Sequence, residues 1–367
     1  MIPGELRLPR NVAQRSPSNM QASDTATTVL TSACTAPKAT RNARSGAGRI
    51  VAFFALIAVL AYALDAFIGF SLRRLPTGDF GEWNRIVQGQ VNAEVVVSGS
   101  SRALTHYDPQ ILARATGRTA YNIGLNGSQT DMQLARLKTY LRHNRKPLLV
   151  VQNLDAFSFQ VTHGEVYDPG QYVPYLNEPD LYEALKAINP ETWKTRCIPL
   201  YGYAVQDLRF GWLQGLGYWL RPEKPPTHFD GFMPRYSQWT GEFDAFRAGN
   251  PNGVRIGVVP AGVALVEELL RLCTAQGIKV VMVYSPEYSE VQAMTNNRAE
   301  IFAQFEALSR KYGATLLDFS DSPISARKDL FYNSQHLTAE GAEAFTRELA
   351  LKLPLVATAA SAGGPPR

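Results

Sequence analysis

The sequence predicts an α/β protein in which a parallel sheet has helices on both faces, with one long apolar helix before it. Three observations support this. Strand-like and helix-like patterns alternate from residue 95 onward, the first strand pattern is an unbroken β-branched run, and residues 50–72 are apolar almost throughout. Strands that alternate with helices form parallel sheets, and strands buried on both faces are continuously apolar.

The amino-terminal part predicts a membrane anchor. Residues 1–48 are rich in Ser, Thr, Ala, Asn and Arg without an apolar period, so we expect a disordered basic tail. The next segment, Ile50–Leu72, has 23 residues with Asp65 as its only charge, which is enough to cross a hydrocarbon core. A cleaved signal sequence is the alternative, because Ala61-Tyr62-Ala63 has the small-x-small form. Asp65 lies late in the span, where it can reach the interface.

The charges around this span favour an amino terminus inside the cell, with the bulk of the protein beyond the cytoplasmic face. Four cations precede the span and three follow it: Lys38, Arg41, Arg44 and Arg49, then Arg73, Arg74 and Arg85. The net charge of +5 is carried by residues 1–49, which hold seven basic and two acidic residues. The remaining chain is neutral, so a nucleic-acid-binding domain is not indicated.

Cysteine usage leaves two alternatives open. Cys34, Cys197 and Cys273 lack the spacing of a metal site or a disulfide framework. Cys197 and Cys273 can either pair outside the cytoplasm, if their geometry permits, or remain as free thiols.

The main domain is expected over residues 76–354, followed by a disordered Ala/Gly/Pro-rich tail over 355–367. Its first strand, Val95–Ser98, ends in a Gly/Ser turn, and a helical pattern opens at Asp108-Pro109. The later expected elements are a strand over Ala120–Ile123, a helix from Thr130, a strand over Leu148–Val151, a helix over 260–276, a strand over Lys279–Tyr284, a helix over Ala299–Tyr312, a strand over Thr315–Phe319 and a helix from Thr338.

An aromatic-rich insert separates the third and fourth strands, over about residues 156–255. It holds four of the five tryptophans: Trp193, Trp212, Trp219 and Trp239. They could form a wall that stacks carbohydrate or binds an acyl group, but we favour a small core belonging to the insert.

Candidate catalytic residues lie near the carboxyl edge of the predicted sheet, where open α/β sheets bind ligands. Ser100 or Ser101, in the turn after the first strand, is a candidate nucleophile. His336 precedes the last helix and can point back over that turn. The other histidines lack a comparable setting and are expected at the surface: His106, His143, His163 and His228.

Three motifs together resemble the SGNH (GDSL) hydrolase superfamily, and most closely its membrane-anchored bacterial envelope members. They are Gly99-Ser100-Ser101, Asn122-Ile-Gly-Leu-Asn-Gly127-Ser-Gln-Thr and Asn333-x-x-His336-Leu-x-x-x-Gly341. The resemblance covers about residues 92–155 and 278–350. It implies an SGNH/flavodoxin-like three-layer sandwich, Ser101 as nucleophile, His336 as general base, and the N–H groups of Ser101 and Gly127 as oxyanion donors.

The chain departs from the superfamily pattern at two places. The asparagine that serves as a further oxyanion donor is displaced by two residues, to Asn153, and Asp155 occupies the nearer register, where a carboxylate would repel an oxyanion. Asn333 stands where the triad aspartate is expected. An amide can orient the imidazole of His336 but cannot stabilise its cation as a carboxylate does. Asp329 is a candidate for that help.

The resemblance implies a membrane-tethered serine esterase in the cytoplasmic (inner) membrane of a bacterium, with its single-pass helix leaving the catalytic domain outside the cytoplasm. An acylated polysaccharide or another ester is the expected substrate, and O-acetyl groups of envelope glycans are the favoured class. Two alternatives stay open: an O-acetyltransferase of envelope polysaccharide, and an inactive module that binds a glycan or a partner. No cofactor, metal or nucleotide is implied, because no P-loop, His-Glu-x-x-His pair or G-x-G-x-x-G is present. The oligomeric state is not predicted.

Overall fold

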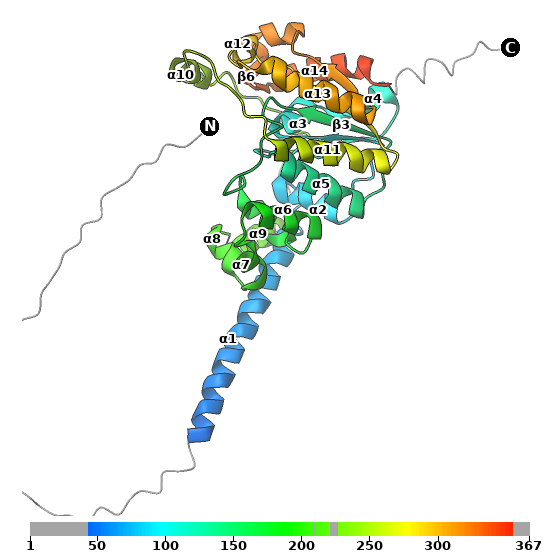
Figure 1. Ribbon diagram of the computed structural model, residues 1–367. Coiled ribbons are helices and arrows are strands. Elements are labelled where there is room, and N and C mark those ends of the chain that lie inside the picture. Colours follow the sequence, from blue (N-terminus) through cyan, green and yellow to red (C-terminus); the bar gives the residue numbers. More distant parts are fainter. Residues whose placement is uncertain (1–42, 209, 221–226, 355–367) are drawn as a thin grey trace, which may run out of the picture. The chain divides into compact units, whose positions relative to one another are not determined.

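The computed structural model describes residues 43–208, 210–220 and 227–354 (Figure 1). The chain divides into two compact units, residues 1–53 and residues 54–367. The first unit is described only over residues 43–53, the start of helix α1. The tails expected to be disordered are residues 1–48 and 355–367. Residues 1–42 of the first tail and all of the second lie outside the described residues.

Helix α1 spans Ala43–Leu72. It starts earlier than predicted, so residues 43–48, expected in the tail, are helical. Its segment Gly46–Leu72 contains 27 residues and is long and apolar enough to cross a membrane, by length and composition. At 1.5 Å per residue it is about 40 Å long, against about 30 Å for a hydrocarbon core.

The carboxyl-terminal end of α1 contacts the insert within the larger unit. Ile68 and Leu72 are buried and pack with Tyr203. The Asp65 carboxylate accepts a hydrogen bond from the backbone N–H of Leu200 at 2.8 Å. Asp65 therefore has a specific partner in the insert.

The sheet has five parallel strands in the order β2-β1-β3-β4-β5. The strands are β1 (Val95–Ser98), β2 (Ala120–Asn122), β3 (Leu149–Leu154), β4 (Lys279–Tyr284) and β5 (Thr315–Asp318). From β1 the chain moves to one side to form β2, then returns to the other side of β1 to form β3. Loops after β1 and β3 diverge at such a switch point and leave a crevice for a ligand.

Both faces of the sheet are covered, as predicted for the three-layer fold (Figure 1). Val96 and Val150 point into one core, whereas Val95, Val97 and Val151 point into the other, because successive side chains of a strand alternate. The first core is closed by α5 (Thr130–His143), α11 (Pro260–Ala275) and α13 (Arg298–Tyr312), and the second by α3 (Ser101–His106), α4 (Pro109–Thr116) and α14 (Ala339–Lys352).

The remaining elements surround this sandwich. They are α2 (Gly78–Val87), η1 (Pro169–Tyr175), α6 (Pro179–Ile188), α7 (Thr192–Cys197), α8 (Tyr201–Val205), α9 (Gly211–Leu220), α10 (Glu242–Gly249), α12 (Ser289–Ala293), η2 (Pro323–Ala326), η3 (Lys328–Leu330), and an antiparallel pair, β6 (Phe331–Asn333) and β7 (His336–Leu337).

The insert shares a hydrophobic core with α2 and α5, and the tryptophans of the insert do not build it. Tyr172 and Tyr175 pack with Trp83 of α2 and the apolar face of α6. Trp193 is exposed, and Trp239 packs with aromatic side chains elsewhere, including Tyr288. Trp212 joins the contact with α1, and the side chain of Trp219 lies outside the described residues. The expected core of the insert is thus a core shared with the rest of the domain, to which the insert contributes tyrosines and aliphatic residues.

The two described cysteines are free thiols, which settles that alternative for this structure. Cys197 is exposed and Cys273 is buried. Burial raises the pKa of the Cys273 thiol to about 12, so it stays protonated and unreactive.

Candidate active site

The two serines after β1 have different roles: Ser100 caps helix α3, and Ser101 is the first residue of that helix. Gly99 has φ +148°, and a Cβ there would lie 2.7 Å from Cβ of Asn153, so a larger residue does not fit. Ser100 is the N-cap of α3, and its hydroxyl accepts a hydrogen bond from the N–H of Arg102 at 3.2 Å. Ser101, the first residue of the helix, is half-buried. The structure therefore favours Ser101 over Ser100 as the candidate nucleophile.

The β6–β7 pair brings His336 to Ser101. The two residues lie 235 positions apart in the sequence, and Nε2 of His336 is 2.8 Å from Oγ of Ser101. Thr338 caps α14 by accepting a hydrogen bond from the N–H of Gly341, which fixes where the chain leaves the pair. The predicted meeting of Ser101 and His336 is present in the structure.

Asn333 sets the tautomer of His336. Its Oδ1 accepts hydrogen bonds from the backbone N–H of Gln335 at 3.1 Å and of His336 at 2.9 Å, and lies 2.9 Å from Nδ1 of the His336 ring. The two backbone groups can only donate, so the Asn333 atom that faces them is the oxygen. Nδ1 of His336 must then carry the proton, and Nε2 of the neutral ring has a lone pair for the Ser101 hydroxyl.

The His336 ring is held neutral. Burial lowers its pKa to about 3, and the positive charges of Arg102 and Arg235 act in the same direction. The amide of Asn333 supplies no negative charge to oppose them. The ring is therefore unprotonated and able to accept a proton over the whole ordinary pH range, while its cation is costly to form.

The two predicted oxyanion donors lie on segments that a backbone hydrogen bond joins, namely the start of α3 and the loop after β2. The N–H of Ser101 belongs to the first turn of α3, where backbone N–H groups have no partner within the helix. Gly127 lies in the loop after β2, is exposed and has φ +61°. The N–H of Leu125 in that loop donates to the carbonyl of Gly99 at 2.9 Å. This bond ties the Gly127 loop to the nucleophile turn.

Asn153 is placed differently from the sequence-based expectation. It is fully buried, and its Oδ1 accepts a 2.7 Å hydrogen bond from the hydroxyl of Tyr107. Its Nδ2 donates to Oδ1 of Asp155 at 3.2 Å and to the carbonyl of Leu154 at 3.3 Å. Because its amide hydrogens are already used inside the protein, Asn153 does not serve as a third oxyanion donor in this geometry.

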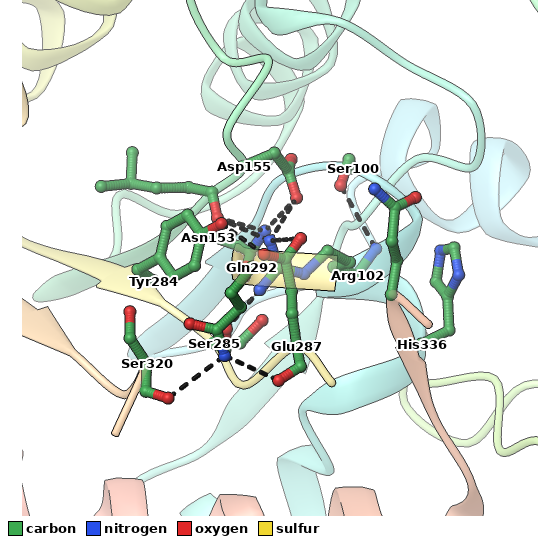
Figure 2. Close-up of polar contacts among 12 residues, drawn as sticks. Ser100, Arg102, Asn153, Asp155, Tyr284, Ser285, Glu287, Gln292, Ser320 and His336 are labelled. Atoms are coloured by element: carbon green, nitrogen blue, oxygen red, sulfur yellow. Dashed lines mark hydrogen bonds and ion pairs between the residues drawn. The ribbon is translucent and has the colours of Figure 1, made fainter. Parts of the chain in front are cut away.

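A buried charge cluster is centred on Arg102, the neighbour of Ser101 in the chain (Figure 2). Arg102, the residue after Ser101, places Nη1 3.2 Å from Oδ1 of Asp155 and 3.1 Å from Oε1 of Glu287, and its Nη2 donates to the carbonyl of Ser285. These partners follow the ends of β3 and β4, so Arg102 ties α3 to both strands. The Asp155 carboxylate is thus paired with the cation of Arg102, which offsets the repulsion of an oxyanion expected from Asp155.

His106 is the site residue that sequence reasoning missed. It was expected at the surface, yet it is fully buried. Its Nε2 accepts a hydrogen bond from the N–H of Leu337 at 3.0 Å, so its proton is on Nδ1, which lies 3.0 Å from the hydroxyl of Ser285. Burial, and next the charge of Arg102, hold the pKa of His106 well below 6.5. His106 thereby anchors the residue next to His336.

Asp329 and the remaining histidines do not contribute to the Ser101–His336 pair. Asp329 is exposed and pairs with Arg327 at 2.5 Å, so it does not assist His336. His143 and His163 are exposed as expected, but His228 is buried. In the described part of the chain, no group of three or more His, Cys, Asp or Glu side chains is placed to hold a metal ion. A cavity of about 1060 Å³ lies away from Ser101 and is lined in part by Arg73, Arg74 and Arg85.

Comparison with known proteins gives only structural neighbours. No family model and no curated protein matches the sequence. Similar solved structures include a protein described as lipolytic and of the G-D-S-L family from Desulfitobacterium hafniense DCB-2, with 12% sequence identity and a TM-score of 0.35. The match covers 71% of this chain and 98% of the Desulfitobacterium chain. A GDSL-like lipase from Bacteroides thetaiotaomicron has 12% identity and a TM-score of 0.33, over 70% of this chain and 87% of its own.

A third neighbour is the acetyl xylan esterase Est2A from Butyrivibrio proteoclasticus, at 10% identity and a TM-score of 0.30, over 71% of this chain and 63% of its own. Two of the three carry the GDSL name. At these identities and TM-scores, the likeness says nothing of this chain's substrate or activity.

Proposed function

We propose that this protein is a membrane-tethered serine esterase of the SGNH type, which cleaves ester bonds through an acyl-Ser101 intermediate. The observation that carries the proposal is the hydrogen-bonded series Ser101–His336–Asn333, with 2.8 Å and 2.9 Å between successive polar atoms. A serine hydroxyl is a weak nucleophile at neutral pH and needs an adjacent base that is itself oriented by a third group. All three parts are present.

The reaction follows from this geometry. Oγ of Ser101 attacks the ester carbonyl carbon while Nε2 of His336 takes the hydroxyl proton, and the carbonyl oxygen becomes an oxyanion near the N–H groups of Ser101 and Gly127. The C–O bond to the alcohol then breaks, and the leaving oxygen takes the proton from His336. A water molecule, deprotonated by the same nitrogen, attacks the acyl-serine and releases the acid and the free Ser101 hydroxyl.

Asn333 is compatible with this mechanism because of its backbone partners. In a serine protease triad, replacing the aspartate by asparagine lowers turnover about 10⁴-fold, because the amide favours the wrong imidazole tautomer. Here the N–H groups of Gln335 and His336 hold the Asn333 oxygen toward Nδ1, so the productive tautomer is kept. What Asn333 still lacks, compared with an aspartate, is a negative charge to stabilise the imidazolium form of His336.

We place the site outside the cytoplasm, on a single-pass protein of a bacterial cytoplasmic membrane. Helix α1 is long and apolar enough to serve as the anchor, and the flanking cations favour a cytoplasmic amino terminus. An acyl ester of an envelope polysaccharide is the substrate class that fits this location.

A fluorophosphonate probe tests the proposal without knowledge of the substrate. The full-length protein in detergent should be labelled, and Ser101→Ala should not. Ser100→Ala is the matched control, because it removes the neighbouring hydroxyl, which caps α3 and hydrogen-bonds Asp155, and leaves Ser101 in place. Loss of the cap costs about 1 kcal/mol. Absence of labelling in the folded wild type would overturn the esterase proposal, and labelling that persists in Ser101→Ala would reject this nucleophile. If labelling is confirmed, partition of the acyl group between water and an added sugar separates hydrolysis from O-acetyl transfer.

A further inference from the structure

Arg235, from the insert, is fixed beside the candidate active site. The N–H of Met233 donates to the carbonyl of Leu104 in α3 at 3.0 Å, and the N–H of Ala339, the first residue of α14, donates to the carbonyl of Arg235 at 2.7 Å. The backbone around Arg235 is thus bound to the helix that begins with Ser101 and to the helix that follows His336.

The side chain of Arg235 reaches the ring that covers the base. Tyr332 stacks on His336, with 5.4 Å between ring centroids and 19° between ring planes. The guanidinium carbon of Arg235 lies 5.8 Å from the centroid of the Tyr332 ring. The positive charge is close enough to lower the pKa of both His336 and Tyr332, although burial raises that of Tyr332 overall.

Arg235 forms no ion pair with any carboxylate in the described part of the chain. Its side chain hydrogen-bonds Tyr332, and its Nε is buried without a hydrogen-bond partner there. Arg102, the other guanidinium that acts on His336, has two carboxylate partners. A partly buried cation without a counter-charge lowers stability. Its planar fork matches a carboxylate in geometry and charge.

A second side chain of the insert, Tyr167, lies on Gly127, the predicted oxyanion donor. Tyr167 packs on Gly127 so closely that a Cβ there would lie 2.4 Å from Cγ of the tyrosine, while 56% of the Tyr167 residue remains exposed. Its ring offers an apolar surface next to the predicted oxyanion donor, with a polar hydroxyl at the edge. The insert therefore supplies both a cation and an open aromatic ring at the site.

We propose that the substrate is an ester that also carries a carboxylate, and that Arg235 binds this carboxylate and makes the enzyme prefer acidic over neutral esters. The inference rests on the proposed esterase function and names its substrate class. The carboxylate can belong to the acyl group, as in a half-ester of a dicarboxylic acid, or to the alcohol, as in an acylated uronic acid. Both present the same chemistry to the guanidinium.

The test compares kcat/KM for paired esters in the full-length protein. 4-Nitrophenyl hydrogen succinate against 4-nitrophenyl acetate examines a carboxylate on the acyl side. An O-acetylated methyl glucuronide against the corresponding glucoside examines one on the sugar side. Wild type should prefer the acidic member of at least one pair, and Arg235→Met should lower that preference about tenfold to a hundredfold, the worth of a charged hydrogen bond. The preference should also fall as salt is added.

Using a ratio removes the effect of Arg235 on the base, because a changed His336 pKa alters both members of a pair alike. Arg255→Met is the matched control. This exposed arginine pairs with Glu300 at 2.5 Å, and its loss should leave the ratio as it is. If Arg235→Met does not fold, Arg235→Lys keeps the charge without the fork and should give an intermediate ratio.

The two proposals fail in different ways. Cleavage of the esters with the same acid-to-neutral ratio in wild type and Arg235→Met would overturn the role of Arg235 and leave the esterase intact. Failure of the folded wild type to cleave any ester or to react with the fluorophosphonate would overturn the esterase itself.

Discussion

Replacing Asn333 by aspartate should move the pH dependence of catalysis and retain activity at neutral pH. The wild-type His336 has a pKa of about 3, so the acid limb of kcat/KM should lie far below the ordinary histidine value of 6.5. A carboxylate whose charge lies about 4 Å from that of the imidazolium stabilises it by about 4 kcal/mol at an effective dielectric constant of about 20. That equals about 3 pKa units, which returns the pKa to about 6.

The sign follows from the role of the base. Only unprotonated His336 accepts the Ser101 proton, so activity falls as pH decreases through the pKa of the ring. Asn333→Asp should therefore lose activity below about pH 6, where wild type is still active, and should match or exceed wild type at pH 7 to 8. The aspartate oxygen can still accept from the N–H groups of Gln335 and His336, so the local geometry is kept.

The measurement is kcat/KM against pH for wild type, Asn333→Asp and Asp329→Asn, with 4-nitrophenyl acetate at constant ionic strength. Asp329→Asn is the control, since that carboxylate pairs with Arg327 at the surface and should not shift the limb. A wild-type acid limb near pH 6.5 that Asn333→Asp leaves in place would refute the reasoning. A large loss for Asn333→Asp at neutral pH would refute the assignment of Asn333.

Two further predictions concern stability, and both are measured by urea unfolding. Arg102→Met leaves Asp155 and Glu287 buried without their partner and should lower the free energy of unfolding by about 3–5 kcal/mol. The control, Arg118→Met, breaks an exposed pair and should lower it by less than about 1 kcal/mol. Equal losses for the two variants would contradict a stabilising role for the Arg102 cluster. His106 is neutral when folded but takes up a proton below pH 6.5 when unfolded, so it should remove about 1.4 kcal/mol of stability per pH unit as pH falls below that value. His106→Gln should make this decline shallower by that amount, and an unaltered slope would mean that His106 is not held neutral.

Much of the sandwich could be predicted from local pattern. The β-branched run at Val95–Val97 identifies a doubly buried strand, and the Thr338 cap identifies the start of α14. Such signals work because backbone preference and periodicity depend on residues close in the chain. Helix α3 was missed for the same reason. It has six residues, without an apolar repeat of its own, and depends on the Ser100 cap and on burial against α14.

Sequence periodicity does not predict the contacts among the buried polar residues. The sequence predicts His106 at the surface because its neighbours in sequence carry no sign of burial, but its partners, Ser285 and Leu337, lie 179 and 231 positions away. The signal that could have been used was Arg102, a cation directly after the candidate nucleophile, with Asp155 and Glu287 just beyond two predicted strands. Long-range ion pairs of this kind leave no periodic trace in a sequence.

The sequence by itself determined the parallel sheet, the apolar amino-terminal helix and the residue types at the sheet edge, because those depend on propensity and hydrophobic period. Only the tertiary structure decided that the Asn333 oxygen sets the imidazole tautomer, that Asp155 faces Arg102, and that Arg235 lies beside the base. These outcomes depend on the directions of single hydrogen bonds and charges between distant segments, which are fixed only when the whole fold has closed.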